Sequence, residues 1–151
     1  PTSAIVKKSV FEMLSPLNDK KILDLYSGIG SLGIESLSRG ASNVTFVEKD
    51  KKVFKVLSDN VCSLCDKKNF QIINSDVNRF FMNNHDTYDI IFADPPYRTI
   101  SFNDLKLKIS KLLNNGGIFC MEKEYEKHEY TDVRIKNYGK TQILIWQKIE
   151  K

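Results

Sequence analysis

Short apolar runs alternate along the chain with longer segments that have an apolar residue at every third or fourth position. The short runs are rich in Ile, Val and Phe and too short for helices, so they predict buried strands. The longer segments predict amphipathic helices with one apolar face. Strands that alternate with helices are typical of a mainly parallel sheet, because parallel neighbours need a long crossover connection.

The predicted elements follow this alternation until the last part of the chain. Strands are predicted at 20–26, 43–48, 70–74, 90–93 and 118–121. Helices are predicted at 3–14, 32–38, 51–64, 77–82 and 103–113. We expect Asn103 to cap the last helix and Asn115, Gly116 and Gly117 to terminate it. Two further strand-like runs, 131–135 and 142–149, are separated only by 136–140, which predicts a hairpin.

The predicted fold class is α/β. We expect a Rossmann-like, seven-stranded, mostly parallel twisted sheet with an antiparallel C-terminal hairpin strand at its edge and helices on both faces. The 151 residues allow one core and leave no room for an added recognition domain, so residues 1–151 are expected to form one domain. Because the chain opens on Pro1, we expect the natural protein to begin earlier.

Composition and charge narrow the function classes. The chain is 41% hydrophobic and 28% charged, has no apolar run long enough for a bilayer and has no signal-peptide pattern, so we expect a cytoplasmic protein. A net charge of +4 is compatible with a polyanionic partner without demonstrating one. Cys62 and Cys65 form a C-x-x-C with no second pair, which favours helix packing over zinc or redox chemistry.

The most informative stretch ends the strand at 90–93, where an acid is followed by Pro95 and Pro96. Neither proline can donate to a ladder or extend a helix, so Asp94 and the Pro95 carbonyl are fixed at the carboxyl end of the strand. Two acceptors with an aromatic ring, Tyr97, suit the planar amine of a nucleobase. The alternative is a capping aspartate in a rigid Pro-Pro turn.

A glycine loop marks the predicted cofactor site. Gly28-x-Gly30-x-x-Gly33 follows a strand and precedes a helix, and Glu48 lies about twenty residues on, where a ribose-binding acid belongs. Glu48, Asp76 and Asp94 all end strands, so we expect them to converge beside the loop at one crevice. Asp24 precedes the loop and could orient an ammonium group of S-adenosylmethionine, or tie down the loop through backbone amides; both interpretations stay open.

These motifs together resemble a known class of enzymes. Asp24-x-x-x-Gly28-x-Gly30, Glu48, Asp76 and Asp94-Pro95-Pro96-Tyr97 resemble the class I S-adenosylmethionine-dependent methyltransferases that act on exocyclic amino groups. With the opening helix after Pro1-Thr2 and the late Tyr138-Gly139-Lys140-Thr141, nearly the whole chain resembles the RsmD family of bacterial 16S rRNA guanine-N2 methyltransferases. The resemblance implies a class I methyltransferase fold and methylation of rRNA.

The resemblance also implies roles for single residues. Glu48 would accept from the ribose hydroxyls of S-adenosyl-L-methionine and Asp76 from its adenine amine. The implied catalytic residues are Asp94, Pro95, Pro96 and Tyr97, and the implied substrate-binding residues are Tyr97 and Arg98. The implied cofactor-binding residues are Asp24, Tyr26, Ser27, Gly28, Gly30, Gly33, Glu48, Lys49, Asp76, Val77 and Asp94. The implied partner is 16S rRNA within the assembled 30S subunit. We expect the protein to bind it as a monomer and to need no metal.

Three other functions are compatible with parts of this pattern. A DNA adenine-N6 or cytosine-N4 methyltransferase would use the same acceptor pair, but the chain has no residues for a target-recognition domain. An NAD-dependent oxidoreductase would use the glycine loop and leave Asp94-Pro95-Pro96-Tyr97 unexplained. A catalytically inactive RNA-binding module of the same fold is the third alternative.

Overall fold

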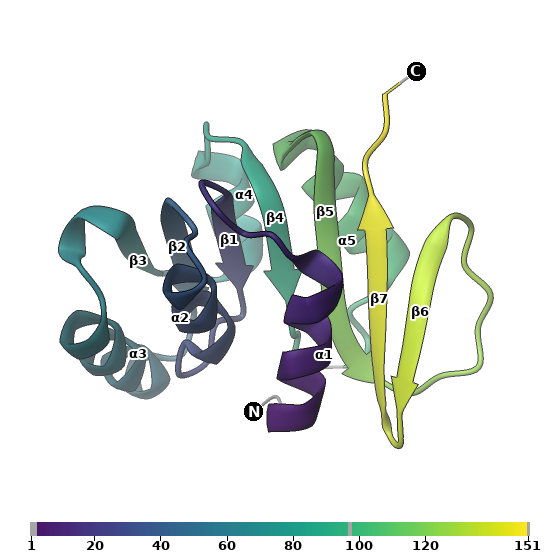
Figure 1. The fold of residues 1–151 in the computed structure, drawn as a ribbon, viewed down its shortest axis with the longest axis horizontal. Helices are drawn as coiled ribbons and strands as arrows, with labels where there is room; N and C mark the ends of the chain where they lie inside the picture. The colour runs from purple at the N-terminus through teal and green to yellow at the C-terminus, as the bar shows by residue number, and fades with distance from the viewer. Residues whose placement is uncertain (1–2, 97, 151) are drawn as a thin grey trace.

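The computed structural model describes residues 3–96 and 98–150 of the chain (Figure 1). Strands and helices alternate as the apolar pattern predicts. In chain order the elements are α1 (Ala4–Leu14), β1 (Lys21–Leu25), α2 (Ser31–Ser38), β2 (Asn43–Glu48), α3 (Lys51–Leu64), η1 (Lys67–Asn69), β3 (Phe70–Asn74), α4 (Val77–Asn83), β4 (Tyr88–Ala93), α5 (Phe102–Ile109), η2 (Ser110–Leu112), β5 (Leu113–Glu124), β6 (Val133–Tyr138) and β7 (Thr141–Gln147).

The seven strands form one sheet in the order β3-β2-β1-β4-β5-β7-β6 (Figure 1). Neighbours from β3 to β5 are parallel, while β7 is antiparallel to both β5 and β6. The mostly parallel sheet with an antiparallel hairpin strand is therefore confirmed. The hairpin forms that edge of the sheet, with β7 between β5 and β6 and β6 outermost. The strand order reverses between β1 and β4, where ligands bind in such sheets.

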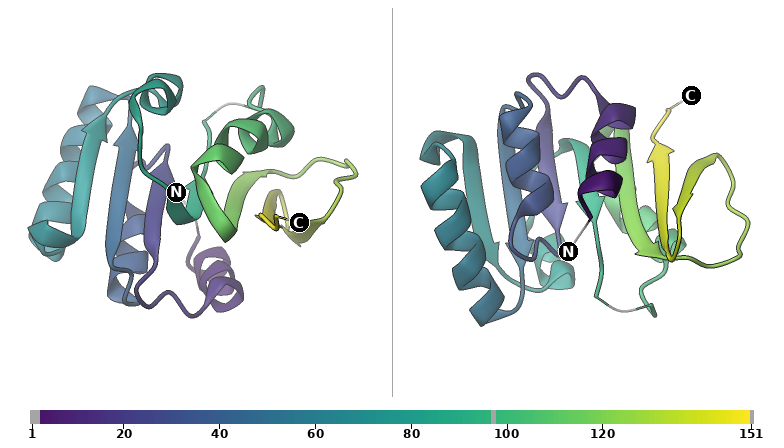
Figure 2. Two further views of the ribbon diagram at one scale, coloured as in Figure 1. Left: turned by 90° about the horizontal axis from the view of Figure 1, so that it is seen from above. Right: turned by 60° about the horizontal axis from the view of Figure 1, so that its bottom comes forward.

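Helices cover both faces of the sheet, as expected (Figure 2). On one face α1, α2 and α3 pack over a core that includes Phe11, Phe46 and Phe92. On the other face α4 and α5 pack over a core that includes Phe102 and Phe119, whose rings stack with centroids 5.2 Å apart. Central strands buried on both sides account for the continuous apolar runs in the sequence.

Two predicted boundaries are wrong for local reasons. The N-cap of α5 is Ser101, whose hydroxyl accepts from the backbone N–H of Asp104, and not Asn103. Gly116 does not end a helix but lies inside β5, where its φ of +83° accompanies an irregular register against β4. Glycine adopts a positive φ readily. It is therefore found both at bulges in strands and at the ends of helices.

The C-terminal hairpin and the cysteine pair also differ in detail from their predictions. The hairpin is confirmed, but its turn is only Gly139 and Lys140, between the paired Tyr138 and Thr141. Cys62 is exposed, so only Cys65 contributes to packing. None of the helices described in the structure combines the length and the apolarity that a bilayer crossing requires.

Gly33 allows α2 to lie close to β2, because glycine has no Cβ. A Cβ at this position would lie 2.2 Å from Cε1 and 2.6 Å from Cζ of the buried Phe46 ring. We expect Gly33→Ala to lower the free energy of unfolding by about 2 kcal/mol, because overpacking outweighs the gain in helix propensity. Urea denaturation of the variant measures this change.

Ser38→Ala in the same helix is the matched control. Ser38 is exposed, so its replacement is expected to change the free energy of unfolding by no more than about 0.5 kcal/mol. Equal urea midpoints for Gly33→Ala and Ser38→Ala would contradict the close approach of α2 and β2.

Candidate active site

The parallel register brings acids from distant parts of the chain to one edge of the sheet. Leu25 of β1 is opposite Val47 of β2 and Ala93 of β4, and Ala93 is opposite Met121 of β5. The residues that follow these register partners therefore lie at the same edge of the parallel part of the sheet. They include Glu48, Asp94 and Glu122.

A cavity of about 1310 Å³ opens at this edge, beside the reversal of strand order. It is large enough for a nucleotide-sized ligand. The structure brings together around it most of the residues predicted to bind a cofactor. These are Asp24, Tyr26, Ser27, Gly28, Glu48, Lys49, Asp76, Val77 and Asp94, together with Pro95 and Pro96 of the predicted catalytic set.

The glycine loop is fixed to the end of β2 by hydrogen bonds. Gly28 N–H donates to Glu48 Oε1 at 2.9 Å, and Ser27 N–H donates to the Val47 carbonyl oxygen at 2.9 Å. The Ser27 hydroxyl donates to the Asp24 carbonyl oxygen at 2.6 Å and accepts from Val47 N–H at 3.0 Å. The loop is thus in a defined conformation before any ligand binds, which lowers the entropic cost of binding.

Gly30 and Gly33 do not line the cavity, although both belong to the predicted cofactor-binding set. Gly30 is the N-cap of α2 and has a φ of +94°, and a Cβ there would lie 2.8 Å from Leu57 Cδ1. Gly33 packs against Phe46, as described above. In the structure these two glycines shape the loop and its packing, while Gly28 borders the cavity.

Asp24 is almost fully buried at the floor of the cavity, with an exposed fraction of 2%. Burial raises the pKa of its carboxyl well above the ordinary value, and a hydrogen bond from the Gly33 backbone N–H acts in the opposite direction. Within the described part of the chain, Asp24 Oδ2 has no hydrogen-bond partner. The Gly33 contact supports the loop-anchoring interpretation, and Oδ2 remains suited to a cationic ligand group.

Glu48 and Asp76 each use part of their acceptor capacity for the backbone. Glu48 Oε2 accepts from Asp50 N–H at 2.9 Å, in addition to the Gly28 contact of Oε1. Asp76 caps α4 through Oδ1, which accepts from Arg79 N–H at 2.8 Å. Each carboxylate has about four lone-pair sites, so both can still accept from a ligand.

Asp94, Pro95 and Pro96 stand between this cavity and a smaller one of about 330 Å³. Ile100 also borders both cavities, while Arg98 and Glu122 line only the smaller one. Arg98 Nε lies 3.4 Å from Glu124 Oε2, so its guanidinium is held at the rim by an exposed ion pair. Tyr97, predicted to stack on a base, lies outside the described residues.

The carboxyl of Asp94 is perturbed by its surroundings. Burial first, and then the charge of Glu122 and a hydrogen bond with it, raise the pKa of Asp94 from 3.8 to about 7. A strongly perturbed acid in a cleft is a recognised mark of a functional site. Asp94 therefore changes its charge near neutral pH.

Glu122 was missed by the sequence analysis, although it obeys the rule that found the other acids. It follows the predicted strand at 118–121 directly, as Asp94 follows 90–93. The charged segment after it, Lys123 to Glu129, has the composition of a solvated loop, which masked the signal. In the described residues no three His, Cys, Asp or Glu side chains are grouped as metal ligands would be.

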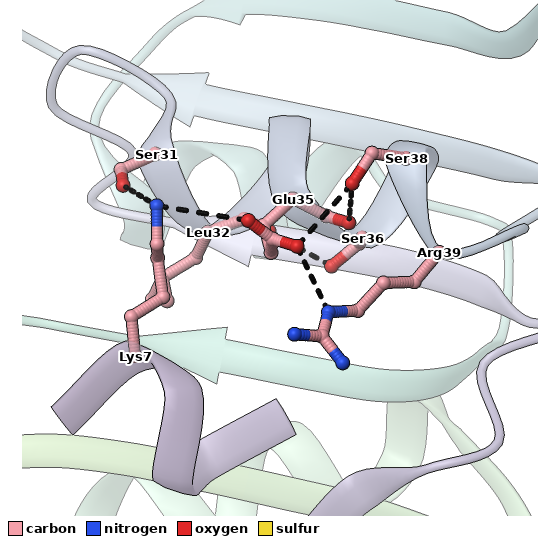
Figure 3. Close-up of polar contacts among 7 residues, drawn as sticks. All are labelled: Lys7, Ser31, Leu32, Glu35, Ser36, Ser38 and Arg39. Atoms are coloured by element: carbon pink, nitrogen blue, oxygen red, sulfur yellow. Dashed lines mark hydrogen bonds and ion pairs between the residues drawn. The ribbon is translucent and has the colours of Figure 1, made fainter. Parts of the chain in front are cut away.

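The opening helix α1 is attached to α2 beside the large cavity (Figure 3). Lys7 Nζ lies 3.5 Å from the hydroxyl of Ser31, which lines the cavity, and 3.7 Å from Glu35 Oε1. Glu35 Oε2 in turn accepts from Arg39 Nε at 2.8 Å, and this contact lowers the pKa of Glu35. Because α1 contacts the first turn of α2, a movement of α1 would displace residues at the cavity rim.

Comparison with known proteins agrees with this architecture. The sequence profile of the family described as "Conserved hypothetical protein 95" matches residues 1–147. The Bacillus subtilis protein YlbH is 31% identical over 160 residues, which cover 98% of this chain and 87% of YlbH. Ribosomal RNA small subunit methyltransferase D of Haemophilus influenzae is 38% identical over 122 residues, which cover 78% of this chain and 62% of the relative.

A solved structure supports the fold class. The RNA methyltransferase from Salinibacter ruber in complex with S-adenosyl-L-homocysteine superposes with a TM-score of 0.77 and covers 100% of this chain and 95% of its own. Its sequence identity is 14%, so the likeness concerns the fold alone. The expected Rossmann-like class I methyltransferase fold is confirmed.

Asp94→Asn removes a carboxyl whose pKa is about 7 in the folded chain and near its ordinary value of 3.8 when unfolded. Because the folded state binds this proton more tightly, the stability of the native sequence falls as the pH rises from about 4 to about 7. We expect the variant to lack this fall. The free energy of unfolding of the variant, relative to that of the native sequence, should rise by on the order of 2 kcal/mol between pH 5 and pH 7.

Urea denaturation at a series of pH values measures this difference. Asp104→Asn makes the same chemical change at an exposed position that lines neither cavity, and should stay within about 0.5 kcal/mol of the native sequence. If the difference in free energy of unfolding between Asp94→Asn and the native sequence does not change with pH, the raised pKa of Asp94 is contradicted.

Proposed function

The chain belongs to the RsmD family, and from this premise we propose that it transfers a methyl group from S-adenosyl-L-methionine to the N2 amine of a guanine in 16S rRNA within the assembled small subunit. One observation carries the proposal. Asp94 and Pro95 stand between a cavity with nucleotide-sized volume and a smaller one, so that a cofactor and a target amine could meet at them.

The lining of the large cavity favours S-adenosylmethionine over a dinucleotide. Five acids line it against two bases; the acids are Asp24, Glu48, Asp50, Asp76 and Asp94, and the bases are Lys49 and Arg79. An acidic lining suits a ligand with an ammonium and a sulfonium cation and opposes a pyrophosphate. The unpartnered Asp24 Oδ2 is the acceptor best suited to the ammonium. When bound, this cofactor supplies an electrophilic methyl group on sulfur.

The strand-end acids would recognise the adenosine portion. Glu48, held by two backbone N–H groups, keeps lone pairs for the ribose hydroxyls. Asp76 keeps Oδ2 for the adenine amine while Oδ1 caps α4. Tyr26 and Val77 supply apolar surface to the same cavity. These residues would hold the cofactor in the cavity that Asp94 borders, with no need for a metal.

Asp94 and the Pro95 carbonyl oxygen would accept the two hydrogens of the target amine. The lone pair of such an amine is delocalised into the ring, so the amine is a weak nucleophile. Acceptance of both hydrogens aligns the lone pair as the bond to carbon forms, and this help is greatest in the transition state. The guanine must leave its stack to reach the site, which costs a few kcal/mol and least in a loop.

The relatives support rRNA as the substrate. Two bacterial relatives, 38% and 35% identical to this chain, are named for methylation of small-subunit rRNA. The Asp-Pro-Pro motif alone fits a DNA adenine-N6 or cytosine-N4 methyltransferase equally well. Arg98 at the rim of the smaller cavity could meet a backbone phosphate of the RNA.

The proposal is tested by transfer of radiolabelled methyl groups from S-adenosylmethionine to unmethylated 30S subunits, naked 16S rRNA and duplex DNA in parallel. We expect N2-methylguanosine from the 30S subunits on nucleoside analysis. Asp94→Asn should lower the turnover number by about 100-fold or more, because one acceptor of the amine becomes a mixed donor and acceptor. Asp104→Asn is the matched control and should retain full turnover.

Two outcomes would contradict the proposal. Label found only in DNA, as N6-methyladenine, would assign the motif to another amine. Full turnover in Asp94→Asn would exclude the role given to that carboxylate.

Glu48→Gln tests the cofactor site separately from methyl transfer. The neutral side chain cannot accept from both Gly28 and Asp50 N–H groups and a ribose together, so both loop order and ribose contacts weaken. We expect the affinity for S-adenosylhomocysteine in calorimetry to fall by about 10-fold to 100-fold. Glu12→Gln, on the exposed side of α1, should bind as the native sequence does; equal affinities in both variants would remove Glu48 from the site.

A further inference from the structure

Glu122 is a second acid at the proposed methyl-transfer centre. Ala93 of β4 and Met121 of β5 are register partners in adjacent parallel strands, so Asp94, which follows the end of β4, lies beside Glu122, which continues β5. Both line the smaller cavity, where the target base would enter, and only Asp94 also borders the larger one. Glu122 therefore contacts Asp94 from the substrate side.

The carboxyl groups of Asp94 and Glu122 line the same cavity one residue beyond the register pair Ala93 and Met121, and the charge of Glu122 and a hydrogen bond with it both raise the pKa of Asp94. Two carboxylates are both acceptors, so such a bond requires one proton between them. Partial burial and the like charges favour this shared proton, as in other carboxylate pairs. The pair thus has a proton-bound form and a fully ionised form. Asp94 is the stronger acceptor in the ionised form, and only in that form can it take up a proton from the amine.

Two of the cations that line the smaller cavity form ion pairs with acids other than Asp94 and Glu122. Asp24 of β1 is a third acid near Asp94. Among the cations of the cavity, Arg98 is paired with Glu124, and Lys123 Nζ lies 2.7 Å from Glu126 Oε2. Lys140 completes the basic residues of the lining. Among the described residues that line the smaller cavity, Glu122 is the charged group that acts directly on the Asp94 carboxyl.

We propose that Glu122 is a positioning residue for the methyl transfer: through its hydrogen bond it holds Asp94 and sets the pH at which Asp94 accepts from the target amine and takes up the proton released. The inference rests on the proposed function. The amine nitrogen forms a bond to the methyl carbon while the carbon–sulfur bond breaks and leaves its electron pair on sulfur. The nitrogen is then cationic, and it loses a proton to Asp94.

The shared proton completes the balance of charge. The ionised pair carries two negative charges before the transfer and one afterwards, with the proton held between Asp94 and Glu122. The smaller cavity is open to solvent, so water can remove this proton before the next turnover. Without Glu122, Asp94 would be a weaker base that ionises at a lower pH.

The pH profile of turnover tests the role of Glu122. In the native sequence we expect turnover to rise with pH as Asp94 loses its proton, with a midpoint at or below about 7 because the bound cofactor cation favours the ionised carboxyl. Glu122→Gln removes the like charge but leaves Asp94 buried, so the midpoint should move down by about one pH unit or more. Glu122→Asp keeps the charge and should return the midpoint toward that of the native sequence. The affinity for S-adenosylhomocysteine should stay within about twofold, because Glu122 does not line the large cavity.

Glu124→Gln is the matched control, since Glu124 lines the same cavity but pairs with Arg98. An unchanged midpoint in Glu122→Gln, or an equal shift in Glu124→Gln, would overturn the inference. NMR titration of 13C-labelled aspartate carboxyls, assigned with Asp94→Asn, gives a readout independent of turnover. If no methyl transfer occurs but the Asp94 titration still moves in Glu122→Gln, the proposed function fails and the pairing stands. If transfer occurs and the titration does not move, only the role of Glu122 fails.

Discussion

The parallel register of β1, β2, β4 and β5 is the constraint on which the site depends. Parallel strands end at one edge of the sheet, so residues separated by most of the chain become neighbours there. Asp24, Glu48, Asp94 and Glu122 come from four different strands, and no local motif could gather them. A slip of one residue in any strand would turn its acid to the other face and break the arrangement.

This gathering of acids has an energetic cost. Asp24 and Asp94 are buried near each other, and burial raises the pKa of both carboxyls. The folded chain tolerates them because backbone N–H groups and a neighbouring carboxyl compensate in part. Residues that destabilise the fold in isolation are common at sites where a ligand completes the compensation. A cationic cofactor in the large cavity would relieve the repulsion and lower both pKa values.

The sequence predicted the parts of the fold that depend on local chemistry. Buried strands, the glycine loop and the Asp94-Pro95-Pro96 strand end each have a signature within a few residues, and the structure contains all three. The place of β7 inside the sheet was not predictable in the same way, because it depends on pairing between strands far apart in sequence. Gly116 was misassigned because glycine serves helix ends and strand bulges equally well. Glu122 was missed because its contact with Asp94 exists only in the assembled sheet.

In the proposed function, the two cavities hold a cofactor and a target amine that meet at Asp94 and Pro95. A crystal structure with a bisubstrate compound, in which a nitrogen in place of sulfur links adenosine and the amino-acid chain to guanine N2, tests it directly. We expect the adenosine between Glu48 and Asp76, and the guanine in the smaller cavity beside Asp94 and Glu122. A guanine left in solvent, with the adenosine bound elsewhere, would contradict it.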